Sequence, residues 1–141
     1  MPSETPAQPT EACPGCGAVL VRADVAASPH GGASASCARL FDVTVRGLRE
    51  EAGTDPAAAA AVRRADAAYD AQHADPADPG RLRVALDTLG AAATGGRTPS
   101  VWRTTIADVA ADLDVIDLTV LIEAWARSVT EDWAAVGATG E

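Results

Sequence analysis

Two cysteines stand at residues 13 and 16 in the turn "CPGCG" and could hold a metal ion together. Such a turn brings both sulfurs to one ion, its backbone N–H groups lower the pKa of the thiols, and Gly17 supplies the positive φ that the turn needs. A tetrahedral zinc site takes four ligands, and the chain has no second Cys-x-x-Cys. The remaining soft or borderline candidates are Cys37, His30 and His73.

The ligand set that the sequence favours is a Cys3His zinc site made of Cys13, Cys16, Cys37 and His73. Cys37 falls in the first turn of a predicted helix, where the helix dipole favours a thiolate. His73 falls on the inner face of the next helix and approaches Cys37 if the two helices pack antiparallel. His30, in a glycine-rich loop, remains an alternative to His73 as the fourth ligand.

Other interpretations of these side chains stay open. Cys13 and Cys16 could form a redox dithiol, although no thioredoxin-like βαβ pattern follows them. Cys37 alone could be a small buried hydrophobe, and His73 could simply stabilise a helix C-terminus. Tyr69 and Trp125 are most simply explained as core residues.

The elements that position these residues are mainly helical. Residues 1–11 carry three prolines among small and polar residues, and we expect a disordered tail. The loop-rich segment that follows contains the apolar run "AVLV", which could pair as a strand. It has too little apolar material for a core, whereas a structural zinc contributes on the order of 10 kcal/mol. We therefore expect the metal, rather than the core, to order this segment.

Capping residues and apolar spacing predict the helices. The first starts at Ser34 or Ser36 and runs to about residue 52, and the second runs from Asp55-Pro56 to about residue 75. The third starts at Asp78-Pro79 and is ended by "TGGRTP"; a short helix lies around 102–113, and the last spans 118–136 with Trp125 and Trp133 as core anchors. The predicted fold is a bundle of four to five helices with an N-terminal zinc knuckle and loop packed on it. It forms one domain over residues 12–136, followed by a tail at 137–141.

Composition narrows the classes of function. The 141-residue chain has a net charge of -9 and no basic cluster, so we expect neither nucleic acid nor membrane as a partner. The absence of lysine excludes a Schiff-base lysine and the usual P-loop. The N-terminus resembles no signal peptide and no run is apolar enough to span a membrane, so we expect a cytoplasmic protein whose cysteines stay reduced. The lack of lysine and asparagine, with abundant alanine and arginine, indicates a high-GC bacterial genome.

With "CPGCG", "GGASASCARLF", "ADAAYDAQH" and "EAWARSVTEDW" in view, the chain resembles a family of small bacterial proteins known as a domain of unknown function. The resemblance covers roughly residues 12–136. It implies matched roles for six positions: Cys13, Cys16, Cys37, Tyr69, Gln72 and His73. The chain departs from the family at Val62 and in "RVALDTLG", where family members carry histidines, and "SPHGGAS" is shorter than the family's loop. These departures weaken any histidine-based catalysis and leave the four-ligand set intact.

Two main hypotheses of function follow. The first is a helical protein with a structural zinc that acts through a protein partner or a groove for a small ligand, because four protein ligands close a zinc site. The second is a small zinc enzyme of bacterial secondary metabolism, a hydrolase, lyase or cyclase. In it one metal position stays open, and Tyr69, Asp70 or His30 acts as acid or base. A third is a redox switch in which oxidation of the thiols ejects the metal.

Overall fold

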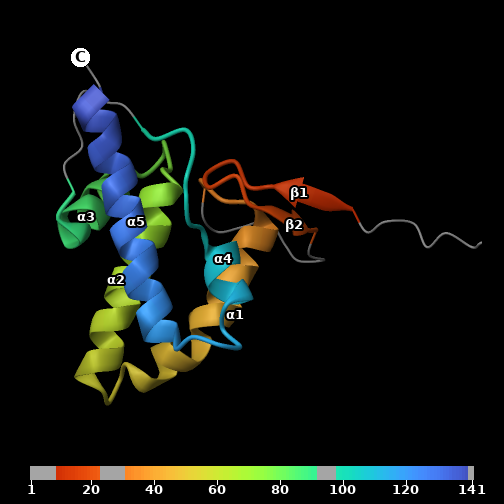
Figure 1. The fold of residues 1–141 in the computed structure, drawn as a ribbon, viewed down its shortest axis with the longest axis vertical. Helices are drawn as coiled ribbons and strands as arrows, with labels where there is room; N and C mark the ends of the chain where they lie inside the picture. The colour runs from red at the N-terminus through yellow and green to blue at the C-terminus, as the bar shows by residue number, and fades with distance from the viewer. Residues whose placement is uncertain (1–8, 23–30, 92–97, 140–141) are drawn as a thin grey trace, which may run out of the picture.

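The computed structural model describes residues 9–22, 31–91 and 98–139, and this part of the chain is mainly helical, as predicted (Figure 1). His30, residues 1–8 of the predicted tail and residues 140–141 lie outside the described residues. The elements, in chain order, are β1 (Thr10–Ala12), β2 (Val19–Val21), α1 (Ala35–Glu51), α2 (Pro56–Gln72), α3 (Pro79–Leu89), α4 (Ile106–Ala111) and α5 (Leu118–Thr139).

Helix α2 is central to the fold, because it packs against α1, α3 and α5. Helices α1 and α2 run in opposite directions in Figure 1, joined by a short turn. The antiparallel arrangement places the start of α1 beside the end of α2. It therefore brings Cys37 and His73 to the same end of the bundle, as expected from the sequence.

The predicted helix starts are confirmed by their caps. The side chain of Ser34 accepts a hydrogen bond from the Cys37 amide at 3.1 Å, and Asp55 accepts one from the Ala57 amide at 2.9 Å. Asp78 caps α3, which has proline in its first turn. The predicted end of α3 at "TGGRTP" is wrong: the helix stops at Leu89 because Gly90 takes a left-handed φ of 72° and closes the last turn.

The core forms where α5 lies against the rest of the bundle. Trp125 and Trp133 are buried, as predicted, and Ile122 and Val129 of the same helix are fully buried with them. The short helix α4 is also confirmed, although Trp102 precedes it and Leu113 lies beyond it, 38% exposed. Helix α5 continues to Thr139, three residues beyond the predicted boundary at 136.

The N-terminal part of the described chain is a two-stranded antiparallel hairpin in which Thr10 faces Val21 and Ala12 faces Val19. The prediction that "AVLV" pairs as a strand is therefore confirmed. Disorder up to residue 11 is wrong for Thr10 and Glu11, because these residues find backbone partners in β2. In the described ranges, no helix combines the length and the apolar character that crossing a membrane would require.

Candidate metal centre

The Cys-x-x-Cys turn is the loop of the β1–β2 hairpin. The Cys13 amide donates to the Ala18 carbonyl at 2.9 Å, and the Gly17 amide donates to the Cys13 carbonyl at 2.9 Å. Gly17 has a φ of 79°, which confirms its predicted role in the turn. We call residues 13–17 the knuckle; pairing of the two strands sets the position of both of its cysteines.

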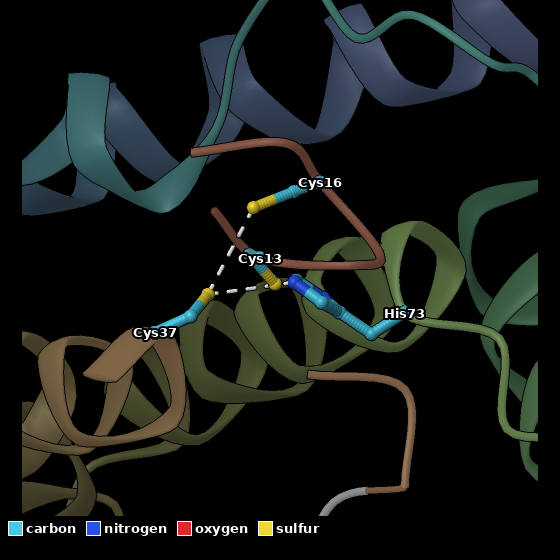
Figure 2. Close-up of side chains that lie close together, drawn as sticks. All are labelled: Cys13, Cys16, Cys37 and His73. Carbon is cyan, nitrogen blue, oxygen red and sulfur yellow. Dashed lines mark hydrogen bonds between the residues drawn. The ribbon is translucent and has the colours of Figure 1, made fainter. Parts of the chain in front are cut away.

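Four side chains from three segments converge beside the knuckle: Cys13, Cys16, Cys37 and His73. The knuckle supplies two sulfurs, the first turn of α1 supplies the third, and the imidazole comes from the residue that caps the C-terminus of α2 (Figure 2). The four ligand atoms all lie within 4.8 Å of one another, and all four residues are buried. The predicted convergence of these residues is thereby confirmed.

The spacing of two donor pairs matches tetrahedral coordination. Bond lengths typical of zinc, about 2.3 Å to sulfur and 2.0–2.1 Å to nitrogen, imply about 3.8 Å between two sulfurs and about 3.6 Å between sulfur and nitrogen. The Sγ atoms of Cys16 and Cys37 are 3.8 Å apart, and Cys37 Sγ is 3.4 Å from His73 Nε2. The cysteines are free thiols, since a disulfide would bring two sulfurs to about 2.05 Å.

Hydrogen bonds around the cluster orient its ligands. His73 Nδ1 lies 2.5 Å from the Tyr69 carbonyl oxygen, an acceptor that fixes the proton on Nδ1 and turns Nε2 toward the thiols. The Tyr69 hydroxyl donates to Cys37 Sγ at 3.3 Å. The imidazole is therefore held in the tautomer that a metal ligand requires.

The thiols and the imidazole perturb one another strongly. Hydrogen bonds from the Cys16 and Cys37 side chains lower the pKa of Cys13. The neighbouring Cys13 and Cys16 raise the pKa of Cys37, and burial raises it further. Burial alone would lower the pKa of His73, but hydrogen bonds to Cys13 and Cys16 outweigh it and raise that pKa to about 9. The cluster thus retains protons when no cation is bound, and a divalent cation can replace them.

Two glycines let the backbone approach the cluster closely. A Cβ at Gly15 would lie 2.6 Å from His73 Cδ2 and 2.8 Å from the Gln72 carbonyl oxygen. A Cβ at Gly32 would lie 2.5 Å from the His73 carbonyl oxygen. The knuckle and the chain before α1 are therefore pressed against the end of α2 at positions that no side chain could occupy.

Two further contacts hold the hairpin, and the sequence analysis missed both. The Trp102 indole N–H donates to the Gly15 carbonyl at 3.0 Å, and the Ser36 amide donates to the Glu11 carboxylate at 3.2 Å. The Ser36 hydroxyl donates to the same carboxylate oxygen, and these hydrogen bonds lower the pKa of Glu11. No local sequence pattern predicts either contact. The only available signals were an acidic residue, Glu11, just before the knuckle and a tryptophan, Trp102, just before α4.

Asp70 and Tyr69, two candidates for the acid or base of the enzyme hypothesis, lie in different surroundings. The Asp70 carboxylate pairs with Arg81 of α3 at 3.0 Å. Burial raises the pKa of Tyr69, as does its hydrogen bond to Cys37, so the phenol keeps its proton.

Gln72, which the family resemblance also singled out, makes hydrogen bonds inside the core. Its side chain accepts a hydrogen bond from the Trp125 indole at 3.1 Å and donates one to the Thr104 carbonyl at 2.6 Å.

Comparison with known protein families gives a match over most of the described N-terminal two thirds of the chain. Residues 11–101 fit the model of a family described as a family of unknown function (DUF5946). The matched stretch contains all four residues of the cluster and ends before α4 and α5, so it is shorter than the resemblance that the sequence motifs suggested. Neither the curated proteins nor the solved structures gave a match. Because the family model spans more than half of the chain, this protein belongs to that family of unknown function.

Proposed function

We propose that the protein binds one zinc ion through Cys13, Cys16, Cys37 and His73, and that the ion has a structural role. The observation that carries the proposal is the spacing of the buried donors, 3.8 Å between two sulfurs and 3.4 Å between sulfur and nitrogen. The other donor pairs lie within 4.8 Å, so closing onto an ion takes shifts of about 1 Å. The ion would fasten the hairpin to the helices.

The donor set suits zinc better than the common hard cations. Thiolate and imidazole are soft or borderline ligands, whereas magnesium and calcium take oxygen ligands. Zinc accepts tetrahedral sites of three cysteines and one histidine, and its Lewis acidity favours the deprotonated thiols. Free cysteines are typical of reducing compartments, so we propose that the protein works in the bacterial cytoplasm.

A catalytic zinc finds less support. An enzyme of the hydrolase, lyase or cyclase type needs an open metal position for water or substrate, and here four protein donors surround one point. All four residues are at most 6% exposed, and Asp70 is engaged by Arg81. These features favour the closed, structural site over the open one.

With the metal closed off, we propose that the protein acts through a protein partner or a small ligand bound elsewhere. A groove of about 350 Å³ lies beside the hairpin, lined by Leu20, Val21, Ser36, Arg39, Leu40 and Val43. It joins β2 to the first turns of α1, so its shape depends on the hairpin being held in place. An ion that fastens the hairpin to the helices would therefore also maintain the shape of the groove.

Elemental analysis of the purified protein, with His73→Ala and His30→Ala as a matched pair, tests the metal site. We expect one zinc per chain in the wild type and in His30→Ala, and loss of zinc in His73→Ala, because only His73 belongs to the described cluster. Cys37→Ser should lose zinc as well. Zinc absent from the wild type, or retained in His73→Ala and lost in His30→Ala, would contradict the proposed ligands.

Cobalt substitution distinguishes the closed site from the open one. Co²⁺ bound by four protein ligands should give a tetrahedral spectrum that small anions such as azide or cyanate do not change. An open position would admit the anion and alter the visible bands. Such a change would support the enzyme alternative.

A further inference from the structure

Tyr69 lies outside the four-ligand cluster and contacts it at two points. Its hydroxyl donates to Cys37 Sγ at 3.3 Å, and its carbonyl oxygen lies 2.5 Å from His73 Nδ1. The side chain is 2% exposed. One residue of α2 therefore reaches two of the four ligands, one through its side chain and one through its backbone.

Aromatic stacking fixes the position of the phenol. The Tyr69 ring stacks on Phe41 with centroids 4.1 Å apart and planes 9° from parallel. On its other side it stacks on the His73 imidazole with centroids 3.9 Å apart and planes at 25°. Because the rings on both sides restrict the tilt of the Tyr69 ring, its hydroxyl already points toward the Cys37 sulfur before any ion binds.

The charge of the site explains what the hydroxyl can do. Three thiolates around a divalent cation leave a net charge of -1, and the α2 C-terminus adds the negative end of a helix dipole. Both lie in the protein interior, where an anion without donors is costly. A hydroxyl that donates to a thiolate stabilises the anionic sulfur and withdraws electron density from it.

We propose that Tyr69 is a positioning residue that sets the electron density on the Cys37 sulfur and holds His73 in its ligating tautomer. This inference rests on the proposed metal site. It assigns Tyr69 to binding rather than to the acid or base role that the sequence suggested. Removal of a group that hydrogen-bonds to a metal ligand typically changes metal affinity 10–100-fold.

The test uses Co²⁺ as a probe and Tyr69→Phe, which keeps the ring and removes the hydroxyl. Without the hydrogen bond the sulfur lone pairs rise in energy, so the sulfur-to-cobalt charge-transfer band should move to longer wavelength. Zinc affinity, measured by competition with a chelating dye, should fall about 10–100-fold. A band that superimposes on that of the wild type, with affinity within twofold, would overturn the inference.

The matched control is Trp133→Phe. It removes a buried hydrogen bond of similar length to the end of α2, from the indole to the Ala71 carbonyl at 3.2 Å, and leaves the hydrogen bonds that link Tyr69 to Cys37 and His73 in place. We expect lower stability in this variant with an unchanged cobalt spectrum. An equal band shift in Trp133→Phe would show that general loosening, and not the Tyr69 hydroxyl, tunes the site.

A second measurement needs no substitution. The chain contains a single tyrosine, so growth on 3-fluorotyrosine labels only Tyr69. The fluorinated phenol is a stronger donor, and the charge-transfer band should therefore move to shorter wavelength, opposite to Tyr69→Phe. No shift would overturn the inference even if Tyr69→Phe fails to fold. A wild type that takes up no cobalt would refute the metal site itself, and this inference with it.

Discussion

The helical body and the N-terminal hairpin are ordered by different forces. In the body, α5 presents Ile122, Trp125 and Val129 to its neighbours with no exposed surface at all. In the hairpin, Val19 and Val21 are 66% and 54% exposed; Cys13 and Cys16 of its loop are buried, and Ala18 and Leu20 pack partly against the core. A two-stranded hairpin is at best marginally stable on its own. The hairpin is therefore held by the Cys3His cluster and a few polar contacts, and the body by burial of apolar surface.

The contrast shows that a short segment can hold a defined conformation without a hydrophobic core of its own. Burial stabilises by about 25 cal/mol per Å² of apolar surface, and the hairpin offers little of it. The proposed ion, held by four donor atoms, would contribute on the order of 10 kcal/mol at a single point. Metal removal and substitutions in the two regions can separate these two sources of order.

Removal of the metal should have the largest effect, and it should be confined to the hairpin. After chelation, the Cys13 and Gly17 amides, which are hydrogen-bonded in the hairpin loop, should lose protection from hydrogen exchange. The amides of α5 should keep theirs, because their protection comes from the apolar core. Readdition of zinc is the control and should restore the hairpin. Equal exchange in the hairpin with and without chelator would contradict the comparison.

Trp125→Ala tests whether the helical body gains its stability from the apolar core. It removes a fully buried indole and leaves the Gln72 amide oxygen without that donor, and we expect a loss of about 3–5 kcal/mol in the free energy of unfolding. Urea unfolding followed by circular dichroism measures the loss. Val120→Ala, at a position 58% exposed on the same helix, should cost less than about 0.5 kcal/mol. Similar losses in both variants would mean that the core is not where the body gains its stability.

Trp102→Phe should give the smallest effect, at the contact between the two regions. The variant loses the indole hydrogen bond to the Gly15 carbonyl, which is worth about 1 kcal/mol. We expect zinc to bind roughly fivefold more weakly, as measured by chelator competition. Arg103→Ala is the control, because Arg103 pairs with Glu131 and Asp132 instead of the knuckle. Weaker zinc binding in the control alone would contradict this assignment.

Much of the helical body could be predicted because its determinants are local. Ser34, Asp55 and Asp78 mark helix starts within one turn of the amides that they cap, and the apolar spacing of α5 identifies its buried face. The four residues of the cluster were also predictable, because a chain with three cysteines and two histidines offers few combinations.

What could not be predicted depends on partners distant in sequence. Thr10 and Glu11 looked like part of a disordered tail because their partners are β2 and the Ser36 amide. The close approach of Gly15 to His73 spans 58 positions, and nothing near either residue indicates it. The end of α3 was predicted wrongly for a different reason. Gly90 alone is enough to end the helix, but the glycines and proline of residues 94–99 gave a stronger helix-breaking signal further along the chain.

The position of His73 at the cap of α2 also constrains how the chain can change in length. Each residue added to or removed from α2 turns everything beyond it by about 100° and shifts it by about 1.5 Å along the axis. One insertion between Pro56 and Tyr69 would rotate the imidazole and the tyrosine away from Cys37 together. Helix α2, 17 residues long, should therefore keep its length, while insertions and deletions accumulate in the connections between helices.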